Sequence, residues 1–429
     1  MESQLGTRVL RKISLRIVPF IMLLYFVAFI DRVNIGFASL TMNKDIGLSP
    51  TVYGFGAGIF FWGYFLFEVP SNIILHKVGA RIWIARVMIT WGIVSAAMAL
   101  VQGATSFYVL RFLLGAAEAG FFPGIILYLT YWYPAEYRAR FLAAFAIAVP
   151  VSTAIGAPIS GLLLGLDGVM GLKGWQWLFI IEGVPSVLLG IVTWFYLTDR
   201  PEKADWLSAE QKAWLKGKLD AEVAAKQAAK HFTFLEALSS SKVLALSAIY
   251  FGFVASLYGM QFWLPQIVKA FGLTNAQTGF VTAIPYAFGT VAMILWARRS
   301  DATRERVFHV GAPLLLTALA LAVSSYITDP TMTMVVLTVA AIGVFCTFAV
   351  FWTLPTAWLA GTAAAGAIAL INSIGNLAGF LGPYLIGWVK ETTGSTSTGL
   401  LVLSLLPLAA GLLVFLGSHE TKTEFVEAK

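Results

Sequence analysis

Long apolar segments dominate this chain and restrict it to one class of fold. Its 429 residues are 59% hydrophobic and only 12% charged, with a mean hydropathy of +0.80, whereas about a quarter of the residues in soluble domains are charged. A helix that spans a bilayer needs roughly 20 mostly apolar residues. The sequence predicts twelve such helices, near residues 16–40, 51–75, 82–102, 105–132, 141–165, 177–197, 243–268, 278–297, 307–327, 331–356, 366–389 and 398–417. We therefore expect an all-α polytopic membrane protein.

The basic residues predict how these helices are oriented. Segments expected on the cytoplasmic side hold 22 of the 29 Lys and Arg residues, and the external loops hold four, which are Lys44, Lys173, Lys269 and Lys390. Cytoplasmic loops of membrane proteins are enriched in Lys and Arg. We expect both termini in the cytoplasm and the protein in the cell inner (plasma) membrane. The net charge of +7 therefore follows from topology and does not indicate a nucleic-acid partner.

One extended polar stretch divides the chain. It predicts an N-terminal six-helix bundle at 1–197, a cytoplasmic linker at 198–242, and a C-terminal six-helix bundle with a short tail at 243–429. Ser208 and Gln211 have the spacing of a helix capping box. An apolar stripe follows the same helix, formed by Trp206, Trp214, Leu215, Leu219 and Val223. An amphipathic helix at the membrane surface and a solvated tether both fit this pattern.

Four of the charged residues inside predicted helices of the first half form two sets. Asp31 and Arg32 are adjacent, and Arg111 and Glu118 lie two turns apart on one helix face. A charge at bilayer depth costs about 2.5–3.5 kcal/mol on insertion scales, so it needs a partner or a wet cavity. Arg111 and Glu118 would be separated by roughly 10 Å, at 1.5 Å per residue, which is too far for a direct bond. We therefore expect the four charges to form one network across the two helices.

These charges suggest an anion site with a proton acceptor. A guanidinium can hold a carboxylate through two parallel hydrogen bonds, so Arg32, with Arg111 beside it, is a candidate for binding an anionic substrate; a structural ion pair is the alternative. Glu118, whose neighbours are small or apolar, and Asp31 are candidate proton-coupling residues. Permanent pairing of Asp31 with Arg111 or Arg86 is the alternative for that acid.

The second half offers amides instead of charges. Gln261, Asn372 and Asn376 lie within apolar helices, where a buried amide must find a hydrogen-bond partner. Hydroxyl groups of a polar substrate would provide partners, and so would neighbouring helices. Cys346 is the single cysteine and no histidine has a partner at metal-ligand spacing. The sequence therefore predicts no metal, no cofactor and no catalytic constellation, and a membrane enzyme is disfavoured.

Five motifs in order resemble the anion:cation symporter family of the major facilitator superfamily, which includes bacterial permeases for sugar acids, tartrate and aromatic acids and the animal sialin-type carriers. The motifs are DRVNIGFA at 31–38, FEVPSNIILHKVGAR at 67–81, RFLLGAAEAGFFPG at 111–124, WQWLFIIEGVPSVLLG at 175–190 and GTAAAGAIALINSIGNLAGFLGP at 361–383. The resemblance covers nearly the whole chain.

The resemblance also implies roles for individual residues. It implies proton coupling at Asp31 and Glu118 and substrate contact at Arg32. It further implies substrate contacts at Gln261 and Asn372 of the second half. By the same resemblance, Tyr64 and Trp352 form aromatic walls of the cavity. The loop His76–Arg81 resembles a degenerate inner-gate motif of the superfamily, so we expect a gating role for Glu68, Lys77 and Arg81.

Together these features predict a secondary active transporter. We expect proton-coupled symport of a small organic carboxylate (a sugar acid, a hydroxy acid or dicarboxylate, or an aromatic acid) by alternating access between the two bundles. A monomer in the lipid bilayer would be sufficient, with the coupling proton as the only ion. Sodium coupling, exchange of one anion for another, and a membrane receptor or sensor without transport are the alternatives.

Overall fold

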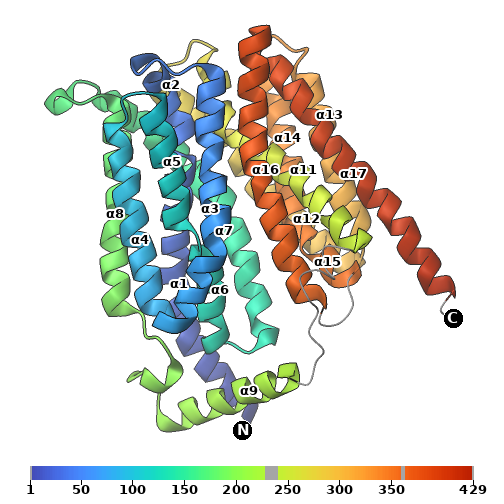
Figure 1. The fold of residues 1–429 in the computed structure, drawn as a ribbon. Helices are drawn as coiled ribbons and strands as arrows, with labels where there is room; N and C mark the ends of the chain where they lie inside the picture. The colour runs from blue at the N-terminus through green and yellow to red at the C-terminus, as the bar shows by residue number, and fades with distance from the viewer. Residues whose placement is uncertain (1, 228–239, 359–362, 428–429) are drawn as a thin grey trace.

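The computed structural model describes residues 2–227, 240–358 and 363–427, which are helical apart from short connections (Figure 1). The helices of the first half are α1 (Glu2–Val33), α2 (Ile35–Asp45), α3 (Pro50–Val78), α4 (Ala80–Ala97), α5 (Ala104–Glu118), α6 (Phe121–Trp132), α7 (Ala135–Leu163) and α8 (Gly174–Tyr196). A short 3-10 turn, η4 (Pro201–Lys203), precedes α9 (Ala209–Gln227). Those of the second half are α11 (Ser241–Lys269), α12 (Asn275–Thr303), α13 (Val307–Ser324), α14 (Pro330–Phe351), α15 (Thr353–Trp358), α16 (Ala363–Thr393) and α17 (Thr396–Glu427).

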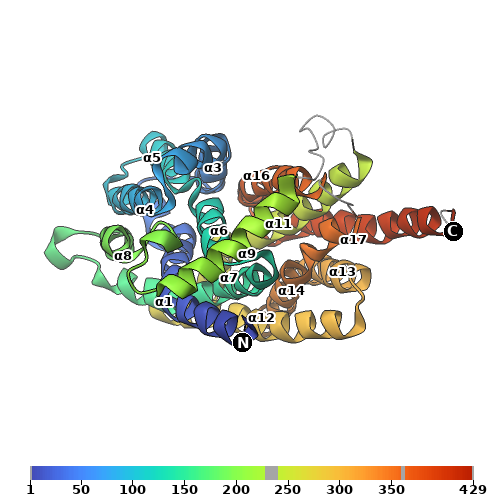
Figure 2. The same cartoon turned by 90° about the horizontal axis from the view of Figure 1, so that it is seen from below.

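The predicted fold class is confirmed. Within the described residues, eleven helical segments are long and apolar enough to cross a membrane, and α16 is a further helix of 31 residues that packs against α3 and α11. The helices form two bundles that stand side by side, α1–α8 and α11–α17 (Figures 1 and 2). Below, the "linker end" is the end of the molecule at which α9 lies, and the "Ser49 end" is the opposite one, where α3 begins.

Three helices that the sequence predicted as continuous are broken. The first breaks at Asn34, between α1 and α2, and the fourth at Ala119 and Gly120, between α5 and α6; the tenth breaks at Trp352, between α14 and α15. Gly120 has φ 85°, in the left-handed region that favours glycine. The hydroxyl of Ser71 donates to the Ala119 carbonyl at 2.7 Å, which satisfies a backbone group freed by that break. The fourth and tenth helices occupy corresponding positions in the two halves, and interrupted helices in such positions point to a binding site.

Close helix contacts join the halves through α3 with α16 and α7 with α12. A Cβ built at Gly54 would lie 2.5 Å from the Pro383 carbonyl oxygen, and one at Gly279 would lie 2.5 Å from the Ala157 carbonyl oxygen. Residues without a side chain are therefore required there, as is usual where membrane helices pack closely.

Polar contacts between the halves gather at the Ser49 end. Ser49 Oγ and the Thr51 amide donate to one carboxylate oxygen of Glu391, at 2.7 and 2.8 Å. Gln266 Nε2 donates to Ser39 Oγ at 3.0 Å. Hydrogen bonds from these residues therefore fasten the two bundles to each other at the Ser49 end.

The linker helix α9 packs on the N-terminal bundle. Leu215 is fully buried, and a Cβ at Gly6 of α1 would lie 2.6 Å from the Trp214 ring. Arg138 of α7 forms an ion pair with Glu222 of α9. The predicted helix is present, and its apolar face packs on α1. Residues 228–239 of the predicted linker lie outside the described residues.

The loop between α12 and α13 holds a carboxylate outside the membrane-spanning helices. Glu305 accepts hydrogen bonds from the backbone amides of Phe308 at 2.7 Å and His309 at 3.2 Å, and its Oε2 lies 2.8 Å from His309 Nδ1. Partial burial raises the pKa of Glu305, but these hydrogen bonds together lower it further, so the net pKa lies below its ordinary value. This carboxylate caps the start of α13 at the linker end.

Candidate functional site

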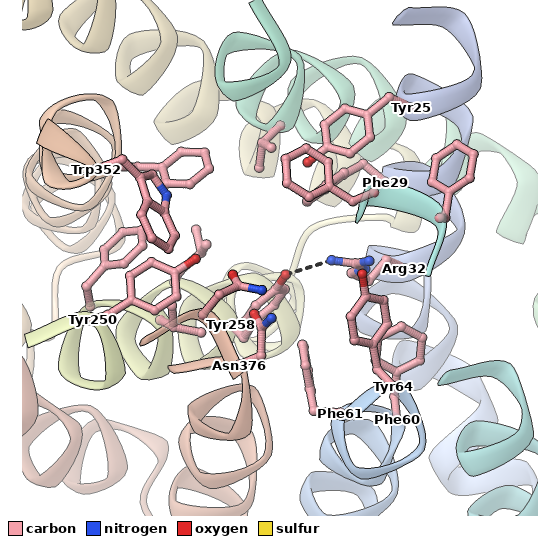
Figure 3. Close-up of a pocket in the computed structure, with 18 residues that line it drawn as sticks. Tyr25, Phe29, Arg32, Phe60, Phe61, Tyr64, Tyr250, Tyr258, Trp352 and Asn376 are labelled. Atoms are coloured by element: carbon pink, nitrogen blue, oxygen red, sulfur yellow. Dashed lines mark hydrogen bonds between the residues drawn. The ribbon is translucent and has the colours of Figure 1, made fainter. Parts of the chain in front are cut away.

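A cavity of about 120 Å³ lies between the two bundles, beside the three helix breaks (Figure 3). Five of the predicted substrate residues line it: Arg32, Tyr64, Trp352, Asn372 and Asn376. They come from both halves, because α1 and α3 supply the first two and the second half supplies the others. The structure therefore brings together residues that are more than 300 positions apart in the sequence.

Arg32 is the only charged residue among the described residues that line the cavity. Its Nη2 pairs with Glu118 and its Nη1 donates to the Tyr258 hydroxyl at 3.0 Å. The guanidinium carbon lies 4.9 Å from the ring centroid of Phe29 and 5.5 Å from that of Tyr64, so aromatic faces surround the cation. The arginine is thus fixed in direction while part of it faces the cavity.

Close packing of α5 on α3 places Glu118 beside Arg32. A Cβ at Gly115 would lie 1.9 Å from the Phe60 carbonyl oxygen, and one at Gly63 would lie 2.2 Å from the Phe112 carbonyl oxygen. The two glycines let the backbones approach, and α5 then ends at Glu118. The side chain of Glu118 is only 2% exposed. Arg32 is its one ion-pair partner among the described residues.

Asp31 does not join this pair, so the predicted four-charge network is wrong for that acid. Trp91 Nε1 and Ser95 Oγ of α4 donate to Asp31 at 2.8 and 3.0 Å, and Ser186 of α8 donates to it as well. Asp31 is buried inside the N-terminal bundle and does not line the cavity. The reason is helical geometry: consecutive residues lie about 100° apart around a helix, so Asp31 faces α4 and α8 while Arg32 faces the cavity.

Arg111 is also separate from the predicted network. It is fully buried and donates to the backbone carbonyls of Gly56 at 3.3 Å and Ala57 at 2.8 Å. Its guanidinium carbon lies 5.2 Å from the ring centroid of Phe60, which itself lines the cavity. The structure therefore places Arg111 behind the cavity wall, where it holds α5 to α3, and not in contact with the cavity.

Gln261 likewise lies outside the cavity wall. Its Nε2 is 3.4 Å from Thr153 Oγ1 of α7, and its Oε1 has no hydrogen-bond partner. The side chain is 3% exposed. The amide thus bridges the halves at the level of the cavity and leaves one buried acceptor unpaired, which is costly unless a further donor reaches it.

The three predicted gating residues are not brought together. Glu68 is buried in α3, Lys77 is exposed, and neither forms an ion pair with any described residue. Arg81 pairs with Asp199 after α8, where Asp199 Oδ1 accepts from the Arg81 backbone amide at 3.1 Å and Oδ2 lies 3.5 Å from its Nε. The basic loop is therefore fixed to the end of the sixth helix, through an aspartate that the sequence did not indicate.

Three tyrosines in the cavity wall were missed: Tyr25, Tyr250 and Tyr258. Figure 3 shows Tyr258 reaching across from α11 to Arg32. A signal did exist, because Tyr258 lies one turn before Gln261 and buried tyrosines normally find a partner for the hydroxyl. Aromatic residues are so frequent in this chain, at 14%, that the pattern alone did not single them out.

Comparisons with known proteins agree with this architecture. The model of the Major Facilitator Superfamily matches residues 21–383 and 266–428. A protein of Agrobacterium vitis named "Putative tartrate transporter" is 60% identical over 414 residues, which are 96% of this chain and 94% of that protein. A quinolone resistance transporter of Acinetobacter baumannii is 45% identical over 409 residues, 95% of this chain and 94% of that protein.

Among solved structures, an inward-facing, occupied bacterial homologue of the human lysosomal transporter Spinster superposes with a TM-score of 0.78. The superposition covers 94% of this chain and 96% of that one. At 18% identity, this likeness concerns the fold alone. Family match, relatives and fold lead to one conclusion: the chain is a membrane-spanning transporter, not an enzyme, and belongs to the major facilitator superfamily.

Proposed function

We propose that this transporter carries a small organic carboxylate, of the hydroxy-dicarboxylate type, together with a proton. The observation that carries the proposal is the Arg32–Glu118 pair, which combines the one cation of the described cavity wall with a buried acid. An anion entering the cavity has a single arginine to bind, and that arginine already holds a carboxylate.

Substrate and Glu118 therefore compete for the same guanidinium. When a substrate carboxylate takes the fork of Arg32, Glu118 loses its ion-pair partner while it remains buried. An unpaired charge in such a site is strongly disfavoured, and a proton on Glu118 removes it. One proton thus accompanies the entry of the substrate. Asp31 is a weaker candidate for this proton, because it does not contact Arg32 and keeps its three hydrogen-bond donors when the substrate enters.

The rest of the cavity suits an acid that also carries hydroxyl groups. The tyrosines Tyr25, Tyr64, Tyr250 and Tyr258 and the amides of Asn372 and Asn376 provide donors and acceptors around Arg32. The volume of about 120 Å³ favours a small molecule. A relative named for tartrate transport is 60% identical over almost the entire chain. These observations together support a tartrate-like substrate.

The contacts between the bundles support transport by alternating access. In this conformation the halves are fastened at the Ser49 end, through Glu391, and at the cavity, through the bond between Arg32 and Tyr258. Rocking of one bundle against the other would break these bonds and open the Ser49 end. Because we place both termini on the cytoplasmic side of a bacterial inner membrane, the conformation described here, which is fastened at the Ser49 end, would open towards the cytoplasm.

Uptake of radiolabelled L-tartrate into proteoliposomes tests the proposal. The parent protein is expected to concentrate the label only under an imposed proton gradient. Glu118→Gln, which cannot bind or release the proton, is expected to lose this accumulation and to keep exchange of internal for external tartrate. Glu210→Gln, at an exposed position of α9, serves as the control.

Two results would contradict the proton role. One is accumulation by the Glu118→Gln variant that equals that of the parent. The other is equal uptake when a sodium gradient replaces the proton gradient, which would favour sodium coupling. If tartrate is not moved while another carboxylate of a panel is, the coupling mechanism stands and the substrate assignment changes.

A further inference from the structure

A second pocket lies at the linker end, away from the central cavity. Its volume is about 310 Å³, and it is lined by Lys12, Leu15 and Arg16 of α1, Tyr196 at the end of α8, and Trp206 of the linker. The start of α1 and, far from it in the sequence, the end of α8 with the linker that follows it therefore meet around two cations. Neither the transport cycle nor the gating loop uses these residues.

Aromatic rings hold Arg16 in place. Its guanidinium carbon lies 5.3 Å from the ring centroid of Tyr196 and 5.2 Å from that of Trp206. The Tyr196 hydroxyl donates to the Arg16 backbone carbonyl at 2.9 Å, and Trp206 stacks on Trp132 with ring centroids 5.3 Å apart. Cations over aromatic faces are stabilised without losing their hydrogen-bond donors. The five N–H groups of Arg16 thus remain available to a ligand.

The two cations of the pocket have no acidic partner within the described residues. Throughout the described parts of the chain, no carboxylate forms an ion pair with Lys12 or with Arg16. Other basic residues at the same end are paired, such as Arg81 with Asp199. The pocket therefore presents two uncompensated positive charges, and the ligand that complements it is an anion.

An apolar surface continues from this pocket along the helices. Leu15 is 69% exposed and Phe195, next to Tyr196, is 80% exposed. Ile191 and Leu188 of α8 are also exposed, one and two turns before Phe195 on the same side of that helix. Exposed apolar helix faces in a membrane protein contact lipid tails, and Tyr and Trp side chains gather at the level of the headgroups. A ligand of this pocket would thus have an anionic head and apolar chains.

We propose that the Lys12–Arg16 pocket binds the phosphate headgroup of an anionic phospholipid, with its acyl chains along α8. Basic pockets between helices at the membrane surface bind such headgroups. The bound lipid would join α1, α8 and the linker, because each of them contributes to the pocket wall. It would thereby stabilise the N-terminal bundle at the linker end.

Native mass spectrometry of the purified protein, titrated with phosphatidylglycerol or phosphatidylcholine, tests this site. Replacing both cations, in Lys12→Gln with Arg16→Gln, is expected to weaken binding of the first phosphatidylglycerol roughly thirtyfold, at about a tenfold change per 1.4 kcal/mol and about 1 kcal/mol per cation. Lys12→Gln alone, at an exposed position with no contact to lose, is expected to weaken it about fivefold. Phosphatidylcholine binding should not change.

The control removes the same charge at the linker end outside the pocket, with Lys216→Gln and Arg298→Gln, both exposed. It should leave phosphatidylglycerol binding as in the parent. Equal loss in the control and in the pocket variant would show a general effect of charge and overturn the site. Displacement of the lipid by inorganic phosphate at the same concentration would also overturn it, since the pocket would then bind a soluble anion.

Discussion

The geometry of Arg32, and not only its charge, is expected to determine how tightly the substrate binds. Arg32→Lys keeps one positive charge in the cavity and keeps the surrounding aromatic faces of Phe29 and Tyr64. What it removes is the planar fork, because an ammonium group cannot present two parallel N–H donors to a carboxylate. The variant therefore separates the two contributions of the residue.

The size of the effect follows from the bonds of Arg32. In the structure its two terminal nitrogens hold two partners, Glu118 and Tyr258, which shows that both directions are used. A bound carboxylate that loses one of two charge-assisted hydrogen bonds loses about 1.5–3 kcal/mol. This corresponds to a dissociation constant roughly 10- to 150-fold higher.

Isothermal titration of detergent-solubilised protein with L-tartrate, or with the carboxylate that a thermal-shift panel selects, measures this ratio. Arg86→Lys is the matched control. Arg86 lies on α4 over the ring of Trp83, at 3.7 Å, and does not line the cavity. An Arg32→Lys affinity within twofold of the parent would refute the reasoning, since the charge alone would then explain binding.

Three further outcomes are expected from other parts of the structure. Tyr258→Phe removes the hydrogen bond between Arg32 and the second half. Single-molecule fluorescence energy transfer between labels on the two bundles at the Ser49 end should then show the state with a larger label separation more often. An unchanged distribution of label distances would mean that this bond does not fasten the halves. Gly115→Ala should lower the midpoint of thermal unfolding, at a cost of about 1–3 kcal/mol for overpacking, because its Cβ would lie 1.9 Å from a carbonyl oxygen, whereas Gly217→Ala on α9, with open space around it, should not lower it. Glu305→Gln should lower the unfolding temperature at neutral pH. The pKa of Glu305 is lower in the folded protein than its unfolded value of about 4.3, so the carboxylate stabilises the fold at pH values above about 4.3, and this stabilisation is lost as the pH falls through the folded pKa. A difference in unfolding temperature from the parent that persists unchanged at about pH 2 would contradict the assignment.

Much of the fold could be predicted because its cause is local. A helix of apolar residues satisfies its own backbone hydrogen bonds inside a membrane, so segment length and hydropathy were sufficient to place the spans. The breaks were not visible in the same way. Gly120 is one of 39 glycines, and its close approach to Ser71 of α3 is visible only in the tertiary structure.

For the candidate site, the positions of polar residues within apolar helices showed that a few polar side chains must be buried. Such side chains need hydrogen-bond or ion-pair partners. Arg32, Tyr64, Trp352, Asn372 and Asn376 do meet in one cavity. Which partner each buried group takes was decided only by tertiary packing. Arg32 and Asp31 are neighbours in the chain, yet one binds Glu118 and the other binds α4 and α8. The cost of burying a charge is a property of the residue, whereas the group that offsets this cost comes from another helix, whose position depends on how all the helices pack.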